Sequence, residues 1–145
     1  EIAQCLVGSE MCIRDSTHTW KLVKEYPDCY DSLAHINYPL RYMARDGQHL
    51  TLEPFRDQVE EIFRQVAASG HALEVNTCRG MSLEEWLPLL RWFKDCGGEY
   101  VTVGSDAHQP EHMALGIPEA LELLREAGFS HITTYQGRRP VLHKL

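Results

Sequence analysis

The sequence lacks any hydrophobic run that approaches the roughly 18 residues a membrane-spanning helix requires. It is also poor in positive charge. Its 145 residues include 14 lysines and arginines against 21 aspartates and glutamates, which gives a net charge of −7. This balance argues against a nucleic acid or an anionic membrane surface as the main partner. We therefore expect a globular protein with neither nucleic-acid nor membrane partners.

No Cys-x-x-Cys pair is present among the five cysteines. Two of them, Cys5 and Cys12, lie in the first 16 residues, and the other three are widely spaced along the chain. An odd number of separated cysteines is typical of a reduced, cytosolic protein rather than a disulfide-bonded secreted one. The sequence therefore predicts a cytoplasmic location.

The first 16 residues differ in character from the rest. The string at 6–16 resembles the translation of an adapter used in sequencing libraries. We expect residues 1–16 to be such a scar, outside the fold. The domain is then expected over residues 17–145.

From residue 17 onward, strand patterns alternate with helix patterns. Apolar residues at helical spacing predict helices over 54–69, 82–96 and 118–127. Short apolar or β-branched runs predict strands over 32–36, 72–76, 99–103 and 131–135. Strands joined by helices form parallel sheets with right-handed crossovers, so the expected fold class is α/β.

Polar residues follow each of the four predicted strands. In parallel α/β folds, ligands bind outside the carboxyl ends of the strands, where such residues would converge. The residues concerned are His35, then Asn76 and Arg79, then Asp106 and His108, and finally Arg138 and Arg139.

The strongest local motif is Gly104-Ser105-Asp106-Ala107-His108, directly behind an apolar strand pattern. A carboxylate and an imidazole two residues apart can reach one point above a sheet, and divalent metals take such oxygen and nitrogen ligands. We expect Asp106 and His108 to be metal ligands and catalytic groups, with His35 as a third ligand. A loop cap and a solvated loop histidine are the structural alternatives for Asp106 and His108.

Four further residues are candidates for the same site. Glu74 shares a strand face with Asn76, and could be a ligand, a partner that orients a ligand, or a group facing the helices; orienting a ligand is favoured. Asn76 is expected to hydrogen-bond substrate or a ligand. Arg41 and Arg79 are candidate phosphate contacts, because guanidinium groups match phosphate geometry. Surface salt bridging is the alternative for both arginines.

As an ordered set, these segments resemble the C-terminal half of the histidinol-phosphate phosphatases, in the polymerase-and-histidinol-phosphatase (PHP) superfamily. The resemblance covers about residues 31–145. It is carried by 34–42, Leu73-Glu74-Val75-Asn76-Thr77, Gly97-Gly98, 104–108 and Gly137-Arg138-Arg139-Pro140.

This resemblance implies the C-terminal portion of a distorted (β/α)7 TIM-like barrel with a metal centre at the strand ends. The ions would be zinc, manganese or iron, three in the complete enzyme. The implied reaction is hydrolysis of L-histidinol phosphate to L-histidinol and phosphate in histidine biosynthesis. His35, Asp106 and His108 would bind metal, and Arg41 and Arg79 would hold the phosphate. Asp106 would also accept a proton from the attacking water.

The family's opening His-x-His motif and its next ligands are absent from this sequence. We therefore expect the chain to be a truncated, inactive fragment of the enzyme. Two alternatives stay open. One is a PHP-type phosphoesterase that acts on nucleotides, and the other is a non-catalytic half-domain that serves as a scaffold.

Overall fold

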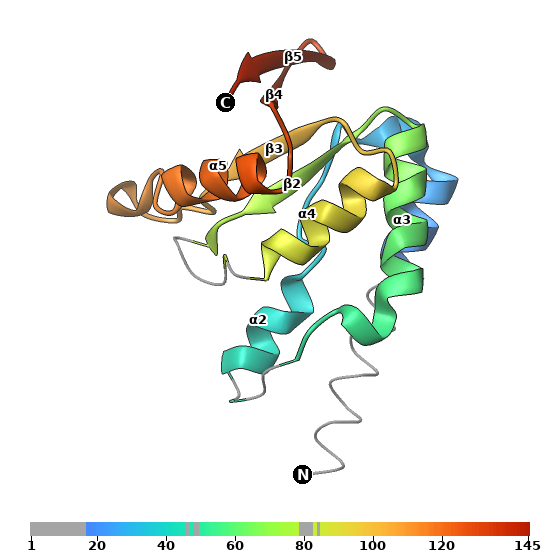
Figure 1. Ribbon diagram of the computed structural model, residues 1–145, viewed down its shortest axis with the longest axis horizontal. Coiled ribbons are helices and arrows are strands. Elements are labelled where there is room, and N and C mark those ends of the chain that lie inside the picture. Colours follow the sequence, from blue (N-terminus) through green and yellow to red (C-terminus); the bar gives the residue numbers. More distant parts are fainter. Residues whose placement is uncertain (1–16, 46, 48–49, 79–82, 84) are drawn as a thin grey trace.

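The computed structural model describes residues 17–145 except 46, 48–49, 79–82 and 84 (Figure 1). Its centre is a parallel sheet of β1 (Ser32–Leu33), β2 (Ala72–Asn76) and β3 (Val101–Gly104), in the order β1-β2-β3. The expected alternation of parallel strands with helices is confirmed for this part of the chain. The expected adapter remnant at 1–16 lies outside the described residues.

Three helices bury their apolar stripes against the sheet: α3 (Arg56–Ala68), α4 (Trp86–Asp95) and α5 (Ile117–Glu126). The helical spacing seen in the sequence places four side chains of α3 in the core, namely Val59, Ile62, Phe63 and Val66. Phe93 of α4 links the layers, because its ring contacts Phe63 edge-on at 5.3 Å and stacks with Phe129 at 6.5 Å. The core therefore lies between the helices and one face of the sheet.

Two of these helices begin later than predicted. Pro54 lies in a separate 3-10 turn, η2 (Glu53–Phe55), and α3 starts directly after it. The helix expected from residue 82 begins at Trp86, so Pro88 falls in its first turn. A proline is tolerated there because its missing N–H would have no partner within the helix. The predicted capping residue Ser82 lies outside the described residues.

The sequence did not predict α2 (Tyr38–Arg45), since no helix was expected before residue 54. Pro39 is its second residue, a position that suits proline, and Leu40 and Met43 are buried at helical spacing. The strand before it is also shorter than the expected 32–36. It ends at Leu33 because His35 has a left-handed backbone, with φ of 61°, that no strand can continue.

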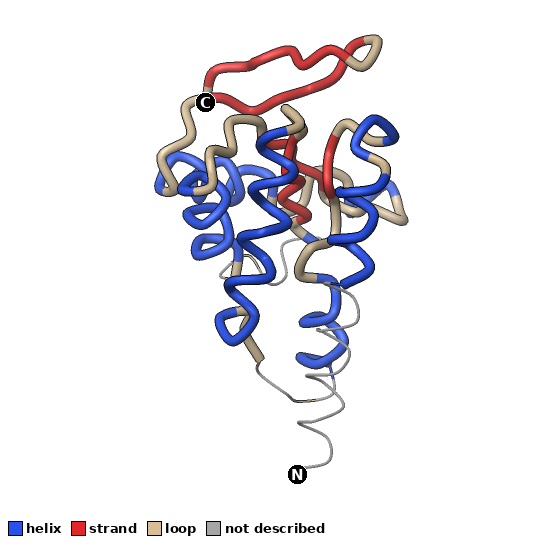
Figure 2. Tube along the Cα trace, turned by 90° about the vertical axis from the view of Figure 1, so that its right-hand side faces the viewer, coloured by secondary structure: helices blue, strands red, loops and turns tan. Residues whose placement is uncertain are grey.

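The prediction that a fourth strand joins the parallel sheet is wrong. β4 (His131–Gln136) pairs instead with β5 (Arg139–Lys144) in an antiparallel hairpin. Gly137 and Arg138 connect the two strands with φ of 56° and 62°, the backbone of a type I′ turn. That turn matches the strand twist and returns the chain at once, which leaves no crossover. Figure 2 shows the hairpin lying across one end of the molecule.

The remaining elements are short. Residues 17–25 are helical, and two further 3-10 turns are η1 (Pro27–Cys29) and η4 (Pro110–His112). Among the residues that the structure describes, no helix is both long enough and apolar enough to cross a bilayer.

Candidate active site

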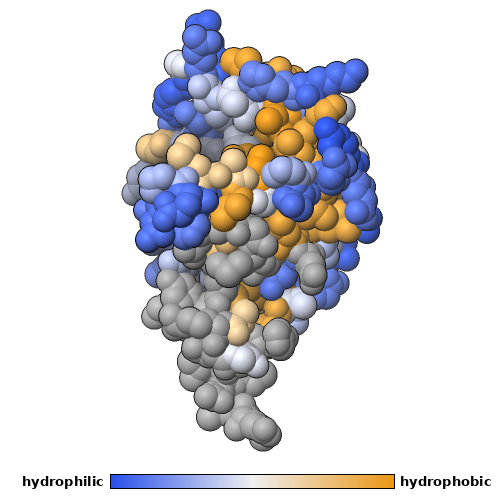
Figure 3. All heavy atoms as spheres, turned by 90° about the vertical axis from the view of Figure 1, so that its left-hand side faces the viewer, coloured by the Kyte–Doolittle hydropathy of each residue, from blue (hydrophilic) through white to orange (hydrophobic). Residues whose placement is uncertain are grey.

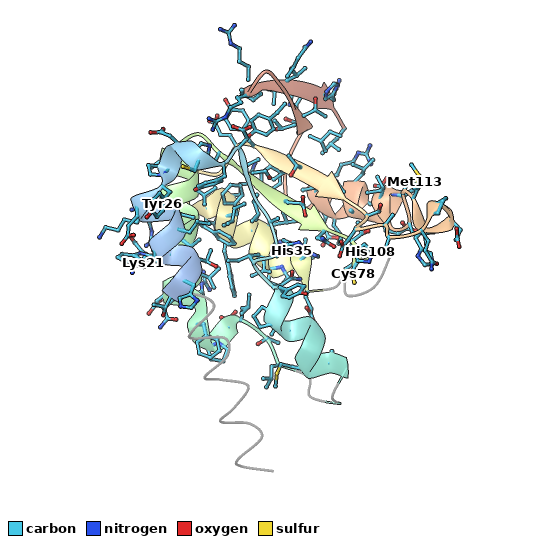
Figure 4. The ribbon with its side chains drawn as sticks, turned by 180° about the vertical axis from the view of Figure 1, so that it is seen from behind. Lys21, Tyr26, His35, Cys78, His108 and Met113 are labelled. Carbon is cyan, nitrogen blue, oxygen red and sulfur yellow. The ribbon has the colours of Figure 1, made fainter. Side chains whose placement is uncertain are left out.

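The parallel strands end on the side of the molecule that Figure 3 presents, where exposed apolar and polar side chains are mixed. At this edge the chain takes a left-handed conformation two residues after each strand. The φ angles are 61° at His35, 45° at Cys78 and 54° at Asp106. Residues other than glycine rarely adopt this conformation, and such strain is concentrated at functional sites. In Figure 4, His35, Cys78 and His108 all lie at this edge of the sheet.

Asp106 and His108 come together in the loop that follows β3. Oδ1 of Asp106 lies 3.5 Å from Nε2 of His108, and the two side chains are 25% and 75% exposed. A carboxylate that is mostly covered beside an accessible imidazole offers one oxygen and one nitrogen donor to the same point. Oxygen and nitrogen are the donor types that divalent metals take in proteins.

The described residues include no group of three or more His, Cys, Asp or Glu side chains placed to hold one ion. The expected third ligand, His35, lies at the same edge, where its ring packs edge-on against Tyr38 at 5.2 Å between ring centres. The structure thus brings two of the three expected ligands together. The metal-binding role of all three remains a prediction.

Glu74 and Asn76 point away from the helices. Leu73 and Val75, the alternate residues of β2, are fully buried in the core. Side chains alternate along a strand, so the alternative that Glu74 faces the helices is wrong. Nδ2 of Asn76 lies 3.5 Å from Oε1 of Glu74.

Asn76 holds the start of the loop after β2. Its Oδ1 accepts a hydrogen bond of 2.8 Å from the backbone N–H of Cys78, and its carbonyl accepts one of 3.0 Å from Nε1 of Trp86. Only 4% of Asn76 is exposed. The left-handed turn at Cys78 is therefore stabilised by a side chain that the sequence suggested for substrate contact. That contact remains a prediction.

The predicted phosphate contacts are placed only in part. Arg41 lies in α2, but its side chain is outside the described part of the structure, and Arg79 lies outside the described residues altogether.

The prediction that Arg138 and Arg139 reach the same edge is wrong. Arg138 donates from Nε to Oδ1 of Asp31 at 3.0 Å and from a terminal nitrogen to the carbonyl of Asp28 at 2.7 Å. Asp31 precedes β1, so this arginine lies at the amino end of the sheet, and Arg139 begins β5 beside it. The hairpin turn carries both residues away from the candidate site.

Sequence analysis missed the residues that tie the two loops of the site together. Oγ1 of Thr77 donates to the carbonyl of Leu115 at 2.6 Å, and Oγ of Ser105 accepts from the N–H of Ala114 at 3.3 Å. The sequence did contain a signal for these contacts, because a hydroxyl residue directly follows β2 and another directly follows β3. The Thr77 bond holds the long β3–α5 loop against the end of β2, and the Ser105 bond links the two ends of that loop.

Three curated proteins are similar to this chain. The "Probable histidinol-phosphatase" of Thermotoga maritima is 32% identical over 119 residues, 80% of this chain and 48% of that protein. The "Histidinol-phosphatase" of Lactococcus lactis is 31% identical over 76% of this chain and 42% of that protein. The "Probable histidinol-phosphatase" of Clostridium acetobutylicum is 30% identical over 64% and 38%. The chain thus spans about half the length of the curated relatives it matches, or less.

A solved structure is similar as well. It is the histidinol phosphate phosphatase of Lactococcus lactis, complexed with zinc, L-histidinol and phosphate. The match has a TM-score of 0.79 and 26% identity, and it covers 92% of this chain and 52% of that one. No protein-family model matches the chain. The resemblance to histidinol-phosphatases that the sequence indicated is confirmed by these relatives.

Proposed function

We propose that the full-length protein containing these residues is a metal-dependent histidinol-phosphatase, which hydrolyses L-histidinol phosphate to L-histidinol and phosphate. The observation that carries this proposal is the structural match to a protein complexed with zinc, L-histidinol and phosphate. The Asp106–His108 pair at the carboxyl end of β3 supplies matching chemistry. The proposed setting is histidine biosynthesis in the cytoplasm.

The proposed fold is the distorted (β/α)7 barrel expected from the sequence. Three features support it: parallel strands in sequential order, helices against one face of the sheet, and polar side chains on the other face. In a barrel the second face would line the interior. The carboxyl ends of the strands, where the site lies, would then form one rim.

The donor set fits a divalent metal. Asp106 and His108 would hold it, joined by His35 from the loop after β1, and oxygen and nitrogen donors suit zinc. Manganese or iron would suit the same donors, and the complete enzyme would hold three ions. The further donors would come from outside the described residues. When bound, the metal polarises the phosphoryl group and acidifies water.

Residues of this chain would position the phosphate ester and accept the proton of the attacking water. The carboxylate of Asp106, oriented by its left-handed backbone, would accept a proton from the attacking water. Arg41 and Arg79 would bind the phosphate oxygens through paired N–H groups and stabilise the charge that develops there during transfer. Asn76 would fix the backbone at Cys78, where the chain leaves β2.

The test is an assay of the full-length protein on L-histidinol phosphate and on a nucleoside monophosphate, before and after removal of metal with a chelator. We expect turnover of the first ester only, lost on chelation and restored by zinc. The substitution Asp106→Asn should lower kcat by about 100-fold or more, as loss of a general base does. Asp95→Asn, in an exposed carboxylate at the end of α4, is the control and should leave kcat unchanged.

Two results would contradict the proposal. Turnover of the nucleotide alone would favour the alternative phosphoesterase. A protein that binds no metal stoichiometrically and hydrolyses neither ester would favour the scaffold alternative.

A further inference from the structure

The sheet has a polar face that the helices do not cover. Ser32 pairs with Ala72, and Thr102 pairs with Glu74, so all four residues share one face of the three strands. The opposite face carries the buried Leu73 and its neighbours. This polar face runs towards the same edge as Asp106, and whatever binds there meets hydroxyl and carboxylate groups.

The polar face is concave. The hydroxyls of Ser32 on β1 and Thr102 on β3 lie 2.8 Å apart, although β2 runs between the two strands. They can meet only because the sheet curls and because Ala72, between them, has a small side chain. Side chains on such a face converge, so Glu74 projects towards the other polar side chains rather than away from them.

Glu74 reaches the last residue of β3. Its carboxyl carbon lies 3.5 Å from the point where a Cβ on Gly104 would stand, a space that glycine leaves open. Asp106 follows two residues later. The half-buried carboxylate of Glu74 therefore lies on the concave face next to the strand end that carries the metal-binding pair.

The described residues provide Glu74 with an amide partner but no cationic one. Asn76 donates to Glu74 at 3.5 Å, and none of the ion pairs among the described side chains involves Glu74. A carboxylate removed from water is stabilised by a positive charge placed against it. The position thus favours a ligand that brings its own cation.

We propose that Glu74 binds the ammonium group of the substrate and selects amino-alcohol phosphates over uncharged phosphate esters. This inference rests on the proposed function. In an amino-alcohol phosphate the ammonium stands on the carbon next to the ester methylene, close to the phosphate. With the phosphate at the Asp106–His108 pair, the ammonium lies over the adjoining concave face, where a charge-assisted hydrogen bond to Glu74 holds it.

The experiment compares two esters on the full-length, metal-loaded protein: L-histidinol phosphate and its desamino analogue, 3-(imidazol-4-yl)propyl phosphate. The substitution Glu74→Gln keeps the shape and removes the charge. We expect KM for L-histidinol phosphate to rise about 10-fold, the equivalent of one lost charge-assisted contact, while KM for the analogue changes less than about 2-fold. Glu74→Asp should recover part of the selectivity.

Glu99→Gln is the matched control, because Glu99 is exposed and lies just before β3, at the far end of that strand. Metal content is measured on every variant. An equal loss on both esters, or a loss of metal in Glu74→Gln, would overturn this inference while leaving the phosphatase proposal standing. If the unmodified protein hydrolyses neither ester, the phosphatase proposal itself fails.

Discussion

Gly98 shows how a single missing side chain lets the core close. It is buried beside the end of α4, and a Cβ at this position would lie 2.4 Å from Cε1 of Phe93. Phe93 is fully buried between Phe63 and Phe129, so its ring has no space to withdraw. The glycine is required by a close approach rather than by an unusual backbone.

Substitution Gly98→Ala should therefore lower the free energy of unfolding by about 1–3 kcal/mol, the usual cost of overpacking a core. Urea denaturation of the chain measures this difference. The control is Gly70→Ala, where φ is +69° but no atom lies within 4 Å of the new Cβ. That variant should lose about 1 kcal/mol through backbone strain alone. A loss at Gly98 no larger than the loss at Gly70 would contradict the packing argument.

The cysteines differ in their expected reactivity. Burial, with the negative charge of Glu60 as a smaller cause, raises the pKa of the Cys96 thiol, and its Sγ lies 3.6 Å from the carbonyl of Glu60. A raised pKa leaves less thiolate at neutral pH, and the thiolate is the reactive form. Cys29 is exposed.

We expect iodoacetamide at pH 7.5 to modify Cys29 at least about 10-fold faster than Cys96, because thiolate fraction and access act in the same direction. Peptide mass spectrometry over a time course measures both rates. Raising the pH should narrow the difference, since more of the Cys96 thiol ionises. If the two cysteines are modified at equal rates in the folded chain, as they are in urea, the burial of Cys96 does not protect it.

At the scale of elements, the β4–β5 hairpin is fastened to the amino end of the parallel sheet. Arg138 reaches both Asp31 and the carbonyl of Asp28 from the hairpin turn. The Arg138 and Asp31 side chains are 60% and 30% exposed, so solvent screens their attraction. The contact positions the hairpin more than it stabilises the whole domain.

Arg138→Ala should accordingly cost no more than about 1 kcal/mol of global stability, while hydrogen exchange of the β4 and β5 amides becomes faster. Arg139→Ala, one residue away and exposed, is the matched control and should leave exchange unchanged. The measurement is hydrogen exchange followed by mass spectrometry on peptides covering 131–144. Equal exchange in the two variants would show that the Arg138 contacts do not hold the hairpin.

At the scale of the whole molecule, residues 17–145 expose polar side chains of the sheet and apolar side chains near the strand ends. On the polar face of the sheet, Ser32, Glu74 and Thr102 are partly exposed. Apolar side chains are exposed as well, since Met113 is 70% and Leu115 42% accessible, and Figure 4 shows Met113 on the side where the strands end. Exposed apolar patches favour association, and unpaired strand edges do so too. Among the residues that the structure describes, there is no cluster of three metal donors that could hold an ion as tightly as a complete site.

Purified residues 17–145 should therefore bind zinc weakly, with less than one ion retained after gel filtration, and should show no phosphatase activity. The same sample should associate as its concentration rises, which sedimentation velocity measures. The full-length protein, treated identically, is the control and should retain its metal. Stoichiometric zinc and turnover in the short chain would contradict this expectation.

Local patterns in the sequence were sufficient to place most elements. The helical spacing of Val59, Ile62, Phe63 and Val66 predicted α3, and the apolar runs predicted β2 and β3 within two residues of their ends. These features depend on neighbours along the chain and on one buried face, which a sequence displays directly. The Asp106–His108 pair was visible for the same reason.

Other features depended on contacts between distant residues. The position of Arg138 at the amino end and the bond between Ser32 and Thr102 both join parts of the chain far apart in sequence. The β4–β5 hairpin is local, and its signal was the Gly137-Arg138 turn between two strand patterns. Asn76 is buried and bound to Cys78 and Trp86, although its type suggested a substrate contact.

By itself, then, the sequence determined the order of strands and helices, the buried stripes and the chemistry available after each strand, because periodicity and residue type are local properties. Only the tertiary structure decided which side chains meet at the carboxyl edge and that Glu74 lies on the concave face beside Gly104. Register and sheet curvature are set by packing across the whole fold, and no single segment carries that information.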